Sequence, residues 1–207
     1  MAVYGDNFRS YLNKFVFIRS TEGIEEIVEN NPENINGYFA YIFWSKEGQV
    51  CLRIMDVGYG LEDYFETGDE NVDFLVEERI LPIEGKIDDI LYVFDGTIVA
   101  DSERYSRMVA STEMANLVSE EMINARENKE IDEFRDPLNQ DIVTVVFFTK
   151  QLPIKSKAKV KCKGFSKGYF FGELMQIPFG WRNLSVGDEI EFKLDKMNGA
   201  TVLLASV

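Results

Sequence analysis

The sequence predicts an α+β fold: a mixed or antiparallel sheet, one long amphipathic helix and a β-rich C-terminal half. Short β-branched and aromatic runs recur between turn residues before residue 100 and again after residue 141. Between them, about residues 101–129, apolar side chains recur at spacings of three and four. Hydrophobic residues make up 45% of the 207-residue chain, which is sufficient for a packed core.

The N-terminal elements follow from local patterns. Residues 14–19 are β-branched and aromatic and predict a first strand. A helix is expected from about residue 20 to residue 30, because isoleucine and valine share one of its faces and glutamates the other. Residues 37–45 and 49–56 are predicted to pair as a hairpin around Lys46-Glu47-Gly48. Since both faces of 37–45 are apolar, this strand should be central and covered on both sides.

The next segment is less regular in sequence. Residues 58–73 are acidic and contain glycine, so we expect an irregular loop with at most one helical turn. Residues 72–83 fit either a strand or a helix. Residues 89–94 predict a strand, and Asp95-Gly96 a turn into a short strand at 97–99.

One apolar stripe predicts the long helix, which Asp101 or Ser102 would cap. The stripe consists of Tyr105, Met108, Thr112, Ala115, Val118, Met122 and Ala125. Its small members suggest a helix lying close against a sheet. A coiled coil is the weaker interpretation, because the stripe lacks leucine and isoleucine.

The rest of the chain is rich in strand signals. Strands are expected at 141–149, 155–163, 169–175, 189–194 and 201–205. A boundary near Ala100 divides the chain into an acidic α+β part, 1–100, and a helix plus β-rich part, 101–207. The connection is too short for a linker, so a single domain also fits.

Charge is distributed unevenly along the chain. Residues 1–141 carry 31 Asp or Glu against 12 Lys or Arg, a net charge of −19, whereas residues 142–207 carry 5 against 10. The net charge of the whole chain is −14. Such a charge repels nucleic acid and anionic membranes at long range and favours a basic partner, or serves solubility alone.

The residue inventory excludes several classes of site. The chain has no histidine, so Ser-His-Asp triads, Cys-His pairs and histidine zinc sites are absent. It has neither a phosphate-binding G-x-x-x-x-G-K-[ST] loop nor a G-x-G-x-x-G fingerprint. We therefore expect no cofactor and no catalytic residue. Cys51 and Cys162, far apart in sequence, are expected to be free thiols in a reducing cytoplasm, and no apolar run or leader indicates a membrane partner or secretion.

Seven carboxylates in and around the 58–73 segment form a candidate acidic surface. They are Asp56, Glu62, Asp63, Glu66, Asp69, Glu70 and Asp73. Oxygen ligands of this type suit Mg²⁺ or Ca²⁺, and a carboxylate pair can perform acid–base hydrolysis. Their spacing matches no calcium-loop pattern, so a metal is not assigned and solvated loop charge is the simpler interpretation.

A row of lysines forms a second candidate surface. Because a strand has a period of two, the row should project from one face of its strand. It consists of Lys155, Lys157, Lys159, Lys161 and Lys163, with Lys167 following. The row would protect an edge strand from pairing, or contact phosphates, or bind an acidic surface. Tyr169, Phe170, Phe171 and Trp181 are nearby candidates for stacking on bases or for core packing.

A C-terminal pattern carries a family resemblance. It consists of Gly172-Glu173-Leu174, then Pro178, then Leu184-Ser185-Val186-Gly187-Asp188-Glu189-Ile190, after a segment containing Ala125-Arg126. This G-x-L, Pro, L-x-x-G-D-x-[IV] pattern resembles the end of a small uncharacterised bacterial β-rich domain family, over about residues 120–195. Lysines at 155–164 replace the aromatic, acidic and histidine-bearing segment of that family. The resemblance implies a β-rich fold without established catalytic residues, in a family found among accessory and toxin-neutralising proteins.

These observations together predict a cytoplasmic, non-enzymatic acidic protein that engages a basic protein partner, such as an immunity or phage-type inhibitor protein. One alternative is a nucleic-acid or nucleotide binding module that uses the lysines from Lys155 to Lys167. A second alternative is a metal-dependent carboxylate hydrolase built on the acidic segment.

Overall fold

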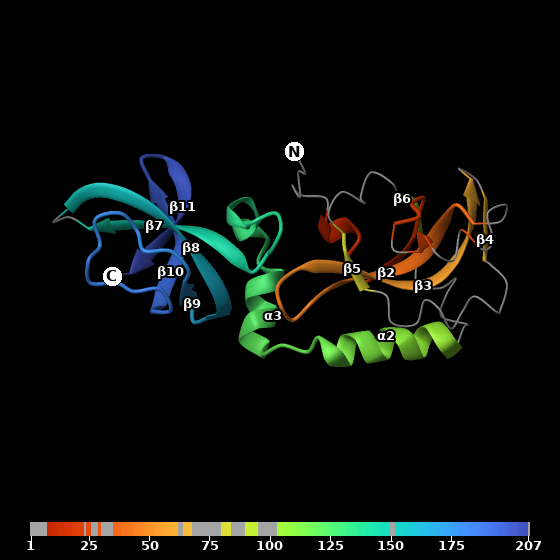
Figure 1. Ribbon diagram of the computed structural model, residues 1–207. Helices are drawn as coiled ribbons and strands as arrows, with labels where there is room; N and C mark the ends of the chain where they lie inside the picture. Colours follow the sequence, from red (N-terminus) through yellow and green to blue (C-terminus); the bar gives the residue numbers. More distant parts are fainter. Residues whose placement is uncertain are drawn as a thin grey trace. The chain divides into compact units, whose positions relative to one another are not determined.

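The computed structural model consists of two compact units, Met1–Leu117 and Val118–Val207. It describes residues 8–22, 24–25, 29, 35–61, 64–67, 80–83, 90–94, 103–149 and 152–206. Figure 1 shows a sheet with a helix along it in the first unit and a barrel in the second. The helix expected at the start of the second part, which begins at Glu103, belongs to the first unit.

The first unit is built on a six-stranded sheet in the order β4-β3-β2-β1-β6, with β5 paired to β3. All of the observed strand pairs are antiparallel. The strands are β1 (Lys14–Ile18), β2 (Gly37–Trp44), β3 (Val50–Leu61), β4 (Tyr64–Thr67), β5 (Ile80–Pro82) and β6 (Ile90–Phe94). A short 3₁₀ helix, η1 (Phe8–Ser10), precedes them.

Strand β2 lies at the centre of this sheet, as its two apolar faces predict. Tyr38, Ala40 and Ile42 join one core cluster, together with Phe8 and Ile24. The opposite face belongs to a second cluster, formed by Phe15, Phe39, Tyr41, Phe43, Cys51, Met55 and Met108. The predicted hairpin between β2 and β3 is confirmed, and Gly48 turns the chain with a φ of 98°.

Helix α2 (Glu103–Ala115) covers the second face of the sheet (Figure 1). Met108 is buried there, and Tyr105 and Val109 pack against the same cluster. Arg53 of β3 reinforces the contact, because its guanidinium donates hydrogen bonds to the Met108 carbonyl at 3.0 Å and to the Thr112 hydroxyl at 2.8 Å.

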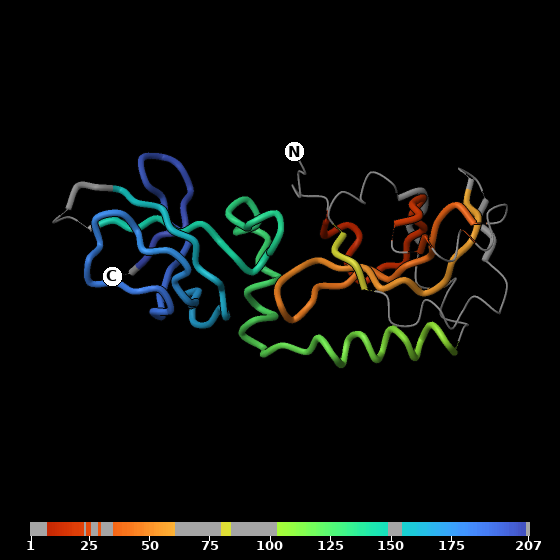
Figure 2. The backbone as a smooth tube through the Cα atoms, in the orientation of Figure 1, coloured from red at the N-terminus to blue at the C-terminus, as the bar shows by residue number. Residues whose placement is uncertain are grey.

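The second unit is a closed five-stranded barrel in the order β10-β11-β7-β8-β9. Its strands are β7 (Ile142–Thr149), β8 (Leu152–Ser166), β9 (Tyr169–Leu174), β10 (Glu189–Met197) and β11 (Ala200–Ser206). Figure 2 traces the chain through them in sequence order. Because successive strands reverse direction, the first and fifth run the same way, and β11 therefore closes the barrel on β7 as a parallel pair.

Strand β8 is long enough to pair with β7 and then with β9, and a bulge between Cys162 and Gly164 interrupts its pairing with β9. Bulges increase the local bend and twist of a strand, which closing a small barrel requires. Opposite the bulge, a Cβ on Gly172 would lie 2.3 Å from the Lys161 carbonyl oxygen. The close approach of the two strands thus requires glycine at this position.

Helix α3 (Glu120–Glu127) and the 3₁₀ helix η4 (Lys129–Phe134) precede the barrel. Ser119 caps α3 by accepting a hydrogen bond from the Met122 backbone N–H at 3.2 Å. The helix packs on β8 so closely that a Cβ on Gly164 would lie 2.7 Å from that of Glu121. Ala125 contributes to the barrel core.

The predicted α+β class is wrong, because the described residues form two β-structures and only short helices. The stripe from Tyr105 to Ala125 is divided between α2 and α3, with a break at residues 116–119. Asn116 marks the break, since its side chain donates a hydrogen bond to the Thr112 carbonyl at 2.8 Å. The apolar spacing happens to continue across a gap that the side chains of Asn116 and Ser119 stabilise.

Other predicted elements have mixed outcomes. The irregular loop expected at 58–73 is wrong in part, because β3 continues to Leu61 and β4 follows from Tyr64. The strand expected at 89–94 is confirmed as β6, and the five C-terminal strands are confirmed. Most of the helix expected at 20–30, and the strand at 97–99, lie outside the described residues.

Among the described helices none is both long and apolar enough to cross a membrane. Cys51 and Cys162 are free, as predicted, and both are buried.

Candidate functional site

Most of the predicted acidic surface lies outside the described residues. This holds for Glu62, Asp63, Asp69, Glu70 and Asp73, while Glu66 is placed on β4 by its backbone. Within the described part of the chain, no group of three metal-ligating side chains converges. The described residues therefore supply no geometry for the metal-dependent hydrolytic site of the second alternative.

Asp56 does not belong to an exposed surface, since only 5% of it is accessible. Its Oδ2 accepts a hydrogen bond of 2.6 Å from the Tyr105 hydroxyl of α2, and its Oδ1 accepts one from the Val57 N–H. The reason is a bulge, because β2 pairs Phe39 with Asp56 and Ala40 with Ile54. This irregularity breaks the alternation, so Asp56 meets the same helix that covers the sheet.

The lysine row is placed as its period predicts. Ser156, Ala158, Val160 and Cys162 are buried inside the barrel, and the lysines alternate with them on the outer face of β8. β8 pairs with β7 from Leu152 to Lys161 and with β9 from Val160 to Ser166. Edge protection is therefore excluded for Lys161, which has a strand on both sides, but it stays an interpretation for Lys155 and Lys157, whose segment pairs with β7 alone among the described strands.

Three lysines of the row lie beside carboxylates of the barrel unit. Lys159 forms an ion pair with Asp136, and Lys163 pairs with Glu173 at 3.3 Å. Lys161 lies directly across from Glu173 in the strand register. Partial burial alone would raise the pKa of Asp136, but hydrogen bonds from Lys159 and from the Leu138 N–H outweigh it and lower that pKa.

Lys155 and Lys157 differ from the other members of the row. Both are exposed, and neither has a carboxylate partner among the described residues. Ser156 lies between them with its side chain on the inner face, where its Oγ accepts a hydrogen bond of 2.7 Å from the Phe179 N–H. The two lysines therefore flank the anchor point of the β9–β10 loop.

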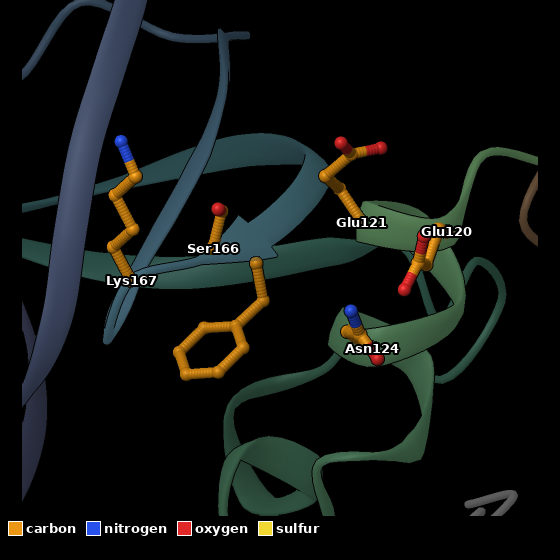
Figure 3. Close-up of a pocket in the computed structure, with 6 residues that line it drawn as sticks. Glu120, Glu121, Asn124, Ser166 and Lys167 are labelled. Carbon is orange, nitrogen blue, oxygen red and sulfur yellow. The ribbon is translucent and has the colours of Figure 1, made fainter.

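Lys167 lies away from the row, in the turn of the β8–β9 hairpin, with a φ of 53°. It borders a surface hollow of about 400 Å³ beside α3. The hollow is lined by Glu120, Glu121, Asn124, Phe165, Ser166 and Lys167. In Figure 3 the Lys167 ammonium points away from Glu120 and Asn124, so the charged ends do not converge on one point.

The aromatic residues named as stacking candidates have different positions. Phe170 and Trp181 are buried in the barrel core, where Trp181 packs edge-on against Phe147. Tyr169 is exposed but lies under the Lys193 ammonium, 6.0 Å from its ring centre. Phe170 and Trp181, two of the four candidates, therefore pack in the core.

Sequence reasoning missed Phe179, the most exposed aromatic residue among those whose exposure the structure describes. It is 78% accessible, in the loop between β9 and β10. Its position between Pro178 and Gly180 was the available signal, since neither neighbour suits a strand interior. Met175, Ile177 and Val186 of the same loop are also exposed.

A buried polar cluster joins α3 and η4 to the barrel. The Arg126 guanidinium donates two hydrogen bonds to Asp141, and Arg135 donates to Asp132 and to the Gln140 and Ala125 carbonyls. Burial raises the pKa of Asp141, and the Arg126 ion pair opposes that shift. The charged groups of this cluster are hydrogen-bonded to each other and to backbone carbonyls, so the cluster has a structural role.

The pattern that carries the family resemblance coincides with packing positions of the barrel. Gly172 permits the close approach of β8, Leu174 and Ile190 are buried, and Gly187 has a φ of 93°. Arg126 holds the Asp141 carboxylate. Comparison of the chain with protein-family models, with curated proteins and with solved structures finds no match.

Proposed function

We propose that this chain is a non-enzymatic acidic binding protein whose first unit engages a basic protein partner, as an immunity or phage-type inhibitor protein would. The supporting observation is how charge divides between the two units. Residues 1–117 carry 23 Asp or Glu against 9 Lys or Arg, whereas residues 118–207 carry 13 of each. The whole excess of −14 therefore belongs to the first unit.

An excess of this size acts on a partner before contact. Clustered carboxylates attract a basic surface through solution, which raises the association rate and disfavours acidic competitors. A protein that must intercept a basic target at low concentration benefits from such steering. Its affinity and association rate should both fall as salt screens the charges.

The test uses the full chain as bait in an extract of its native host. The bait is compared with a variant in which the other six carboxylates of the predicted acidic surface become amides. These are Glu62, Asp63, Glu66, Asp69, Glu70 and Asp73; Asp56 is kept because it is buried. We expect a basic protein that binds the unmodified chain and is lost from the variant.

The matched control removes the same number of negative charges from the second unit. It replaces Glu120, Glu121, Glu127, Glu130, Glu133 and Glu189, all exposed, with glutamine. This control should retain the partner. A partner that both variants bind equally well, or that both lose, would contradict the assignment to the first unit.

A second candidate function, nucleic-acid binding, is favoured by the outer face of β8. Residues 142–187 carry eight Lys or Arg and one carboxylate, Glu173. At about 0.1 M salt the screening length is about 10 Å, so charges farther than this from the face contribute little to its potential. The expected sign is an affinity for oligonucleotides that falls steeply with salt.

A further inference from the structure

Phe179 is held in an exposed position by its neighbours. Its N–H is bound to Ser156 Oγ, and two residues later Trp181 is buried in the barrel core. The Trp181 backbone N–H donates a hydrogen bond to the Pro178 carbonyl at 3.1 Å. This bond closes a tight turn that contains Phe179. An apolar ring that is 78% accessible on such an anchored backbone loses little conformational freedom on binding.

Hydrogen bonds also join the two ends of the β9–β10 loop. The Gly187 N–H donates to the Leu174 carbonyl at 2.8 Å, and the Ser185 N–H donates to Asp188 Oδ2 at 2.8 Å. These bonds fix both ends of the loop relative to the barrel. The loop therefore presents its exposed side chains as a preformed surface.

The charged residues nearest to Phe179 along this loop and at the start of β8 are basic, whereas Glu173, Asp188 and Glu189 lie at the base of the loop. Lys155 and Lys157 are the sequence neighbours of Ser156, the residue that anchors Phe179. The exposed Arg182 lies three residues after Phe179 in the loop. No carboxylate occurs in the sequence from Leu174 to Gly187. An exposed ring with cations on the adjoining strand and three residues further along its loop is complementary to a ligand that combines a flat apolar face with negative charge.

Nucleic acid has this combination, and the aromatic ring selects its single-stranded form. In a duplex the faces of the bases are already stacked on each other, whereas an unpaired base can stack on a protein ring. Lysines that line the path of the backbone then contact phosphates without reading sequence. Ile177, 48% accessible, lines the same surface hollow as Phe179 and extends the apolar surface there.

We propose that the β9–β10 loop and the start of β8 bind single-stranded nucleic acid, with Phe179 stacking on a base and Lys155, Lys157 and Arg182 contacting phosphates. This inference rests on the second candidate function and specifies its ligand. The site is sequence-tolerant, because stacking and phosphate contacts are available from every nucleotide.

Fluorescence anisotropy of the full chain with labelled oligo(dT) of about 20 nucleotides tests the proposal. This length is sufficient because oligonucleotide-binding barrels cover roughly 4–16 nucleotides. We expect tighter binding to this strand than to a duplex of equal length. Phe179→Ala should weaken it by about 5- to 150-fold, the effect of losing one stacked base. Phe179→Trp should retain binding and Phe179→Leu should not, because only tryptophan preserves a stacking face.

Two controls separate stacking from folding and from general charge. Leu138→Ala removes another exposed apolar side chain of the same unit, 52% accessible, and should leave binding unchanged. The pair Lys155→Gln and Lys157→Gln should lower the salt slope by about 1.4. The pair Lys129→Gln and Lys196→Gln removes equal charge from elsewhere in the unit and should not change the slope.

The outcomes are distinguishable. If the lysine pair matters but Phe179→Ala does not, the basic face binds by charge alone and the single-strand proposal fails while the second candidate function stands. If no oligonucleotide binds at about 50 mM salt, both fail. If poly-glutamate displaces the strand as effectively as unlabelled oligo(dT) does, the face recognises acidic polymers in general, and the proposal is again overturned.

Discussion

Arg126 of α3 and Asp141, the residue before β7, form a buried two-point ion pair. The Arg126 Nε lies 3.1 Å from Asp141 Oδ1, and Nη2 lies 2.7 Å from Oδ2. The Asp141 backbone carbonyl also accepts a hydrogen bond of 2.7 Å from the Cys162 N–H of β8. The pair therefore connects the helix to the point where β7 and β8 begin their pairing.

Arg126→Met should strongly destabilise the second unit. It leaves the Asp141 carboxylate buried without its cation, a loss that costs about 3–5 kcal/mol of the free energy of unfolding. Urea unfolding followed by the fluorescence of the buried Trp181 measures the effect, since Trp44, in the first unit, can be replaced by Phe.

The double variant Arg126→Met with Asp141→Leu is the informative comparison. Replacing both charges with apolar groups should recover part of the lost stability, because no unpaired charge remains. Arg182→Gln, on an exposed residue, should have little effect on unfolding. A single Arg126→Met variant as stable as the unmodified protein would show that the ion pair does not hold the helix.

Tyr105→Phe should destabilise the first unit by about 1.5–3 kcal/mol, the range for hydrogen bonds to charged groups. The substitution removes the 2.6 Å hydrogen bond to Asp56 and leaves the volume of the side chain almost unchanged. Tyr59→Phe, on an exposed tyrosine of β3, is the matched control and should change stability by less than about 0.5 kcal/mol. Equal effects of the two substitutions, by thermal or urea unfolding, would argue against a structural role of Asp56.

Local patterns in the sequence were sufficient to predict which side chains are buried where burial depends on the alternation of residues along one strand. The alternation of Tyr38, Ala40 and Ile42 with Phe39 and Tyr41 predicted a strand with two buried faces, and both faces are buried. The lysine row was predicted in the same way. In each case a period of two places the side chains without reference to distant residues.

Features that depend on distant residues were not predictable in this way. Asp56 is buried because a bulge and Tyr105, 49 positions later, act together. The barrel closes through Leu204 and Val146, a parallel pairing that no local pattern encodes. The helix break at Asn116 was obscured because the apolar spacing persists across it.

Gly172→Ala should destabilise the barrel unit, because the added Cβ would lie 2.3 Å from the Lys161 carbonyl oxygen. Backbone atoms on both strands would have to move, and overpacking of this type costs about 1–3 kcal/mol. Gly199→Ala meets no atom within 4 Å, so it reports the effect of a positive φ, 82°, without a clash. If Gly172→Ala unfolds at the same urea concentration as the unmodified protein, the close approach of β8 and β9 is not what requires glycine.

Cys162 should be nearly inert toward thiol reagents in the folded protein. Burial raises the pKa of its thiol from 9.0 to about 11, and the reactive thiolate is therefore scarce at pH 8. Cys51 is also buried, and burial likewise raises its pKa. We expect both to react with a chromogenic disulfide only after denaturation, and rapid labelling of the native protein would contradict this placement.

The same pKa shift predicts how stability changes with alkali. Because the folded pKa of Cys162 lies above the unfolded value, folding favours the neutral thiol, and the contribution is complete below about pH 9. It is lost as pH rises from 9 towards 11, since the unfolded chain releases this proton first. Urea unfolding across this range should show a smaller decline for Cys162→Ala than for the unmodified chain. An identical decline in the two proteins would mean that the fold does not disfavour the thiolate.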